Sequence, residues 1–128
     1  MFNLSSIATD KLTEGTWIDF ASGRFKIASI NNFAFARAYA AAQRPFQRQI
    51  DKGTLDPAVS QELLCRAMSK HILLDWENVG DNGSAVPYSP ETAFNALMNN
   101  PELRSFVQEV AIDIGNFRAE EDEDEVKS

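Results

Sequence analysis

The sequence has little of the chemistry on which disulfide frameworks and membrane anchors are built. Its 128 residues include a single cysteine, so an intramolecular disulfide is excluded. No apolar run approaches the roughly 18 residues that a membrane-spanning helix needs. The first residues have neither a basic start nor a long apolar stretch, so a secretory signal is not predicted. These absences favour a cytoplasmic protein.

The sequence also offers little material for catalysis. Cys65 stands among apolar neighbours, which predicts a buried and inert thiol. His71 is the sole histidine, and no Ser or Cys is spaced to form a relay with it. The acids between residues 75 and 91 lack the spacing of a calcium loop, and Asp81-Asn82-Gly83 has the composition of a turn. We therefore expect no enzyme, no metal site and no cofactor.

Basic residues are scarce at the C-terminal end of the sequence, so most of the negative net charge lies there. The formal net charge is −7, of which residues 119–128 supply −5 through six acids and one base. Residues 1–118 carry 13 acids and 11 bases, a net charge of −2. Nucleic-acid binding needs a basic patch, so no nucleic-acid partner is predicted. We expect one folded domain over residues 1–118 and a disordered, solubilising acidic tail over residues 119–128.

What is present is enough for a folded core, because 44% of the residues are hydrophobic. The segment from Thr13 to Ile30 alternates aromatic and β-branched residues with polar ones, which predicts a β-hairpin. Its turn is expected at residues 21–24, with Gly23 free to take a positive φ. A two-stranded hairpin is marginally stable alone, so it must pack on other elements.

The rest of the sequence predicts only helices. Asn31 or Asn32 can cap the first helix, on which Phe35, Tyr39, Ala42, Phe46 and Ile50 repeat at helical spacing. Pro45 interrupts this segment without shifting its phase, so either one helix is kinked there or a second helix begins. Gly53 has the residue type expected just after a helix end.

Three further helices are predicted to begin at a capping residue followed by proline, and these pairs are Asp56-Pro57, Ser89-Pro90 and Asn100-Pro101. The apolar stripe after the first pair extends from Val59 to Trp76, which predicts a helix ending at that tryptophan. The predicted fold class is therefore α+β and mostly α. An N-terminal β-hairpin packs on a small bundle of about four to five helices.

Five aromatic residues are candidates for either core closure or partner binding: Trp17, Trp76, Tyr88, Phe94 and Phe117. In the first interpretation they close the core where the hairpin, a helix end and a loop meet. In the second they form a docking surface for an apolar helix. The pattern alone leaves both interpretations open.

Four segments, in this order, resemble the tail assembly chaperones of long-tailed (siphovirus-type) bacteriophages. They are TWIDFASGRFKIASI, LLDWENV, DNGSAVPYSPETAF and PELRSFVQEVAIDIGNF with its charged tail, and they span most of residues 13–118. Pro45 and the strength of the acidic end depart from the family pattern, which leaves the helix lengths around residues 44–53 open.

The resemblance implies a non-catalytic protein that binds the tape measure protein, keeps it soluble and helps to recruit tail tube subunits. It also implies a location in the host cell cytoplasm and absence from the mature virion, with self-association left open. Two other hypotheses are a structural component of the head–tail or tail-tip apparatus and an acidic inhibitor of a host defence protein.

Overall fold

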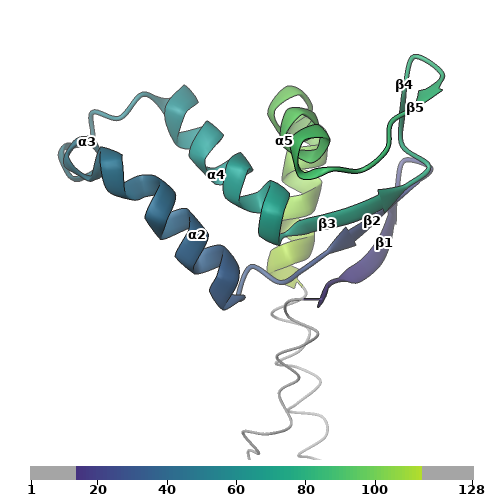
Figure 1. The fold of residues 1–128 in the computed structure, drawn as a ribbon, viewed down its shortest axis with the longest axis horizontal. Helices are drawn as coiled ribbons and strands as arrows, with labels where there is room; N and C mark the ends of the chain where they lie inside the picture. The colour runs from purple at the N-terminus through teal and green to yellow at the C-terminus, as the bar shows by residue number, and fades with distance from the viewer. Residues whose placement is uncertain (1–13, 114–128) are drawn as a thin grey trace, which may run out of the picture.

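The computed structural model describes residues 14–113, which form an α+β fold that is mostly helical, as the sequence predicts (Figure 1). The elements follow the chain as β1 (Thr16–Phe20), β2 (Gly23–Ile27), α2 (Phe33–Gln43), η2 (Arg44–Phe46), α3 (Gln47–Lys52), α4 (Pro57–His71), β3 (Leu73–Glu77), β4 (Gly80–Asp81), β5 (Ser84–Ala85), α5 (Pro90–Asn99) and a helix over residues 101–113, here called the C-terminal helix. The predicted acidic tail and Phe117 lie outside the described residues.

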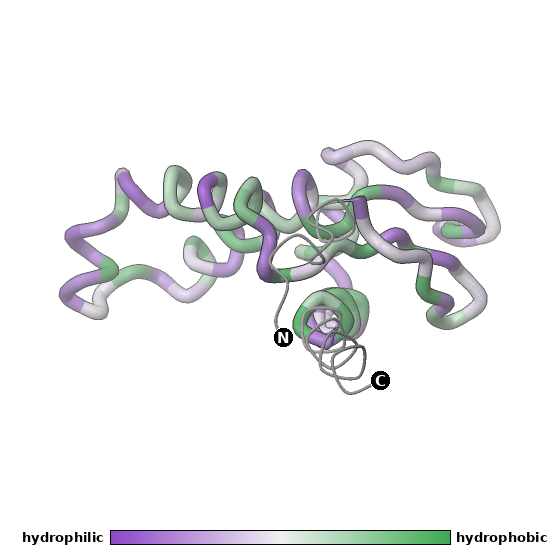
Figure 2. The backbone as a smooth tube through the Cα atoms, turned by 90° about the horizontal axis from the view of Figure 1, so that it is seen from below, coloured by the Kyte–Doolittle hydropathy of each residue, from purple (hydrophilic) through white to green (hydrophobic). Residues whose placement is uncertain are grey.

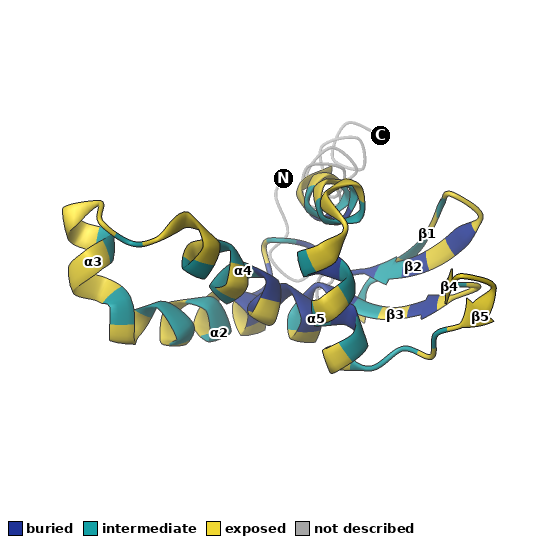
Figure 3. Ribbon diagram, turned by 90° about the horizontal axis from the view of Figure 1, so that it is seen from above, coloured by how far each residue is buried: buried dark blue, intermediate teal, exposed yellow. Residues whose placement is uncertain are grey.

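The molecule is elongated, with the sheet at one end and a helical projection at the other (Figures 1 and 3). We call this projection the arm, and it comprises residues 33–71 with α2, η2, α3 and α4. The helix α5 and the C-terminal helix lie between the arm and the sheet. Buried residues concentrate where α4, α5 and the sheet meet, whereas the outer end of the arm is exposed or half-buried (Figure 3).

The predicted hairpin forms, but it belongs to a larger sheet. Strands β1, β2 and β3 pair antiparallel in that order. The prediction of a helix through Trp76 is therefore wrong, because α4 ends at His71 and the next residues form β3. The expectation that the chain supplies only helices after the hairpin is wrong for the same reason.

A bulge explains why this strand has the apolar spacing of a helix. Lys26 pairs with Asp75 and Ile27 pairs with Leu73, so the residue between the two partners, Leu74, is extra. In a regular strand every second side chain points to the same face of the sheet. The extra residue lengthens this interval, so two side chains three residues apart both point to the core. Leu73 and Trp76, three apart, are consequently both buried, at 0% and 6% exposure.

The turn of the first hairpin differs from the prediction. The residues with positive φ are Ala21 at 48° and Ser22 at 72°, which is the pattern of a two-residue type I′ turn. Gly23 is the first residue of β2 and does not have a positive φ. Its small size matters for packing instead, because a Cβ there would lie 3.2 Å from the ring of Phe25.

The segment predicted as a loop at residues 80–86 contains a second, very short hairpin. β4 pairs with β5, and the connection has positive φ at Asn82 (52°) and Gly83 (83°). The assignment of Asp81-Asn82-Gly83 to turn chemistry is confirmed.

Of the two alternatives at Pro45, a kinked helix or a second helix, the structure shows a second helix. Helix α2 ends at Gln43, and a single 3-10 turn that contains Pro45 separates it from α3. The φ of Gly53 is 68°, so it ends α3 in the left-handed conformation that its residue type predicts.

The predicted caps at Asp56 and Ser89 are confirmed, as is one at Asn32, whereas the side chain of Asn100 donates to Ala96 O at 2.9 Å and, within residues 14–113, does not cap the helix that follows it. The Asn32 side chain accepts a hydrogen bond from Phe35 N at 2.7 Å. The side chain of Asp56 accepts from Ala58 N at 2.9 Å, and the Ser89 hydroxyl accepts from Thr92 N at 3.0 Å. Each satisfies an amide that the first turn of the helix leaves without an intrahelical partner.

The core lies between the inner face of the sheet and the helices α4, α5 and the C-terminal helix. Its largest fully buried side chains are Ile27, Met68, Ile72, Leu73, Leu97 and Val107. The C-terminal helix is joined to the sheet by the stacked rings of Phe20 and Phe106, whose centroids are 4.2 Å apart. In the view of Figure 2 hydrophobic colour gathers in the middle of the chain path, and the outer end of the arm is largely hydrophilic.

Candidate protein-binding surfaces

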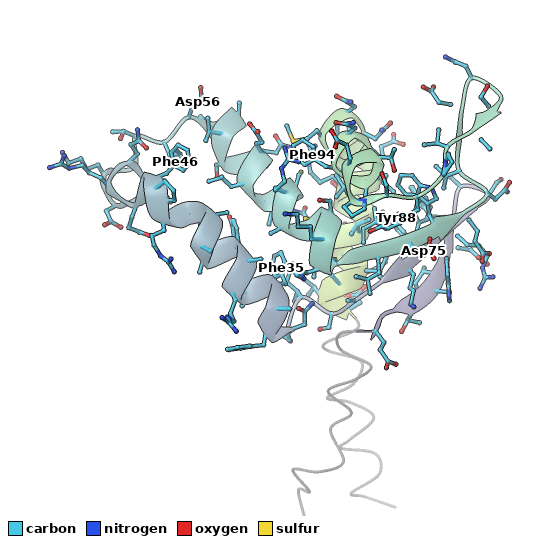
Figure 4. All side chains as sticks on the ribbon, viewed as in Figure 1. Phe35, Phe46, Asp56, Asp75, Tyr88 and Phe94 are labelled. Atoms are coloured by element: carbon cyan, nitrogen blue, oxygen red, sulfur yellow. The ribbon has the colours of Figure 1, made fainter. Side chains whose placement is uncertain are left out.

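Tyr88 lies near the junction of β3 and α4, in the segment before α5 (Figure 4), and its ring contacts Trp76 of β3. Their rings pack edge to face, with centroids 5.4 Å apart. The Trp76 indole donates a hydrogen bond to Val86 O at 2.8 Å, and the ring is only 6% exposed. The Tyr88 hydroxyl lies 2.7 Å from Leu73 O and 3.1 Å from Ser69 O. Both side chains are therefore committed to closing the core.

The environment of Tyr88 keeps its hydroxyl a donor. Burial raises the pKa of Tyr88 above its usual value, and the negative charge of Asp75 raises it further. The neutral phenol is consequently favoured at physiological pH, and its single proton is shared between Leu73 O, at 2.7 Å, and Ser69 O, at 3.1 Å.

Phe94 has a different role, since it joins two helices at their surface. It is half-buried on α5 and points toward α4 (Figure 4). The guanidinium carbon of Arg66, on α4, lies 3.6 Å from the centroid of its ring. This contact is a cation–π interaction, which holds the ring and the arginine together and leaves little of the ring for a partner.

Trp17 lies on the outer face of the sheet, away from the core. Its cross-strand neighbour is Lys26, and the Arg24 guanidinium lies 5.3 Å from its ring. Arg24 also bridges Asp19 at 3.2 Å and Glu77 at 3.4 Å. Of the predicted aromatic candidates within the described residues, Trp17 is the one on a polar, solvent-facing surface.

An open cleft of about 720 Å³ lies between the sheet and α5. Its lining includes the aromatic residues Phe20, Phe25 and Trp76 and the amide residues Asn95 and Asn99 of α5. A cleft lined by both kinds of residue suits an apolar side chain carried on a polar backbone. The sequence alone does not predict this cleft, because its lining comes from segments far apart in the chain.

The single cysteine, Cys65, and the single histidine, His71, do not line this cleft. Cys65 is fully buried, as predicted, and burial raises the pKa of its thiol although the charge of Arg104 acts in the opposite direction. Burial and the charge of Lys70 lower the pKa of His71. Within residues 14–113 no group of three or more His, Cys, Asp or Glu side chains is placed to hold a metal ion.

The arm carries apolar side chains that the core does not cover. Phe33, at its foot, is 75% exposed. Farther out the apolar residues are half-buried and lie apart from the core cluster: Ala42, Phe46, Ile50, Leu55, Val59 and Leu63. Phe46 lies near the outer end of the arm (Figure 4). The first half of α4 has no buried residue, and α3 has none, so these apolar side chains are only partly covered.

Charge is divided unevenly between the arm and the rest of the described chain. The arm has six Lys or Arg residues against three acids, a net charge of +3. The other described residues, 14–32 and 72–113, have three bases against nine acids, a net charge of −6. The nearly balanced sum over residues 1–118 conceals this separation. The charge separation is visible in the sequence as four bases within residues 37–52, namely Arg37, Arg44, Arg48 and Lys52.

The bases of the arm are not neutralised within it. Among the described residues, the ion pairs closer than 4.0 Å involve Arg24 alone, and that residue is on the sheet. Two of the three acids of the arm have other partners, because Asp51 accepts from Gln47 at 2.8 Å and Asp56 caps α4. The positive charge of the arm therefore faces solvent.

The fold is that of a small, mostly helical α+β protein. The sequence matches the YdaY prophage protein family over residues 30–128, and the chain belongs to that family. It is thus a phage-derived protein. The matched residues include the arm, β3 and α5, and begin after the first hairpin.

Comparison with curated proteins gives no match, and comparison with solved structures gives none either. No helix in the described part of the chain combines the length and apolar character needed to cross a membrane.

Proposed function

We propose that this prophage protein is a tail assembly chaperone that binds the tape measure protein, keeps it soluble and helps to recruit tail tube subunits. Membership of a prophage family supports a role in phage biology. The observation that carries the specific proposal is the arm, which presents half-buried apolar residues and a net charge of +3 to solvent. In this proposal the protein acts in the host cell cytoplasm without catalysis, and it is absent from the mature virion.

The arm supports this proposal because it suits a helical partner. An amphipathic helix can lay its apolar face along half-buried residues such as Phe46, Ile50 and Val59, in the manner of helices bound in grooves. The exposed bases Arg44, Arg48 and Lys52 stand beside these residues and favour partner segments rich in Asp and Glu. The tape measure protein of the family that this chain resembles is long, largely helical and apolar, so its helices would supply the apolar face.

Co-expression with the tape measure protein of the same prophage tests the proposal. We expect the tape measure protein to move from the insoluble to the soluble fraction and to be purified together with this chain. Equal solubility with and without this chain, and no complex after purification, would contradict the proposal.

Two further measurements distinguish the chaperone hypothesis from the other two hypotheses. A full-length variant with residues 120–125 changed to Gln or Asn should still bind, whereas an inhibitor acting through its acids should lose its activity. Stoichiometric recovery of this chain from purified virions would instead indicate a structural component.

A further inference from the structure

The tip of the arm is a cluster of exposed cations. Arg44 lies on η2, and Arg48 and Lys52 lie on α3. All three are exposed, and they have no ion-pair partner within 4.0 Å among residues 14–113. Like charges four residues apart along a helix repel one another, and Asp51, the acid among them, accepts a hydrogen bond from Gln47. An anionic segment placed over the three cations therefore lowers the energy of the arm.

The same chain contains an anionic segment of matching charge. Residues 119–128 carry six acids and one base. The rest of the described protein is acidic as well, with −6 outside the arm, so the sheet and the helices around it repel this segment while the arm attracts it. Within residues 14–113 the arm is the part with a positive net charge.

The geometry allows the contact within one molecule. The C-terminal helix lies beside the foot of the arm, where Ile30 N donates to Ala111 O at 3.0 Å. Fifteen residues follow position 113 and can span at most about 50 Å when extended. Helix α2 has 11 residues and is about 17 Å long, so the foot and the tip of the arm are both within reach.

We propose that the acidic segment 119–128 docks on the basic arm of its own chain and covers it until an acidic partner displaces it. Exposed ion pairs contribute little individually, but a tether raises the local concentration of the acids to about the millimolar range. The contact is therefore loose and sensitive to salt. It makes the tail a competitor for the arm as well as a source of solubility. This inference does not depend on the identity of the partner and can be tested without one.

Paramagnetic relaxation measured by NMR on the full chain tests the proposal. A nitroxide is attached to a Ser128→Cys variant, where the native Cys65 does not compete because it is fully buried. We expect the amide signals of residues 44–52 to lose intensity and those of β1 and β2 to keep theirs. Changing residues 120–125 to Gln or Asn, or adding salt to about 0.5 M, should restore the lost intensity because screening then acts within a few Å.

Matched variants give the control. Arg44→Gln with Arg48→Gln should restore most of the intensity of the arm, whereas Arg24→Gln with Lys26→Gln on the sheet should leave the loss unchanged. Loss spread equally over the arm and the sheet, or loss that survives neutralisation of residues 120–125, would overturn the proposal. So would loss that appears when labelled and isotope-enriched chains are mixed, because the tail would then bind a second copy.

Discussion

At the scale of single residues, several side chains stabilise this fold by pairing with backbone groups that helix ends leave free. The Tyr88 hydroxyl lies 3.1 Å from Ser69 O, in the last turn of α4, and 2.7 Å from Leu73 O, at the start of β3. Arg104 acts similarly at the end of α5, where its Nη1 donates to Leu97 O at 2.9 Å. A helix end buried without such partners would be costly, so these polar atoms are part of the core although they are not apolar.

Tyr88→Phe isolates the contribution of this hydroxyl. The ring and its contact with Trp76 remain, but the carbonyl of Leu73 loses a partner in a half-buried position. We expect the free energy of unfolding to fall by about 1–2 kcal/mol in urea denaturation. Tyr39→Phe is the control, because no hydrogen bond of its hydroxyl is found among residues 14–113, and it should cost less than about 0.5 kcal/mol. Equal costs for the two changes would show that the hydroxyl of Tyr88 is not the stabilising group.

Two neighbouring substitutions at the first hairpin turn should change the free energy of unfolding in opposite directions. Ser22 has a φ of 72°, so Ser22→Gly removes strain and should stabilise the protein by on the order of 0.5 kcal/mol after the entropy of glycine is counted.

Gly23→Ala would instead place a Cβ 3.2 Å from the ring of Phe25, which is 5% exposed and closely packed. We expect a loss on the order of 1–2 kcal/mol in the same denaturation assay. A neutral Gly23→Ala variant would indicate that the ring can move aside and that this account of Gly23 is wrong.

At the scale of elements, burial divides the described chain into a well-packed body, which includes the second half of α4, and a thinly packed outer part of the arm. Helix α2 has one buried residue, Phe35, while η2 and α3 have none. Helix α4 is buried only in its second half, from Cys65 onward. Local stability follows the apolar contacts that an opening event breaks, so the outer part of the arm should open at lower free energy than the sheet.

Native-state hydrogen exchange measures this gradient. We expect amides of α3 and of the first turns of α4 to exchange fastest among the helices of the described chain. The amides of β2, which lies between two strands, and of α4 near Met68 should exchange slowest. Equal protection of α3 and β2 would contradict the division into arm and body.

The sequence was sufficient for several features that a local signal determines. The caps at Asn32, Asp56 and Ser89 and the helix end at Gly53 depend on side chains within a few residues of the amides or turns they govern. For that reason the helix starts, the first hairpin and the α+β class were predictable.

Where a distant partner determined the structure, the sequence was not sufficient. A spacing of three between Leu73 and Trp76 fits a helix as well as a bulged strand, and only pairing with β2 decides between them. The cleft and the charge of the arm were missed because both depend on which segments meet in space. Trp76 and Tyr88 could be named from the sequence, but their commitment to the core follows from hydrogen bonds to Val86 and Leu73.

At the scale of the whole molecule, shape and charge follow the same division. The sheet end is compact and acidic, and the arm extends from it with a net charge of +3 (Figure 1). A protein of this form attracts acidic partners to one end and repels them from the other, which orients the encounter. This separation of charge links the proposed function to the proposed docking of residues 119–128, since partner and tail would meet the same surface.

The most direct test of this account is a calorimetric titration of the protein with a soluble helical segment of the tape measure protein. We predict binding that Arg44→Gln with Arg48→Gln weakens by about fivefold or more, because two charge contacts are lost. Arg24→Gln with Lys26→Gln should leave the affinity unchanged. Absence of binding by the unmodified protein, or equal weakening by both pairs of substitutions, would contradict the claim that the arm binds the tape measure protein.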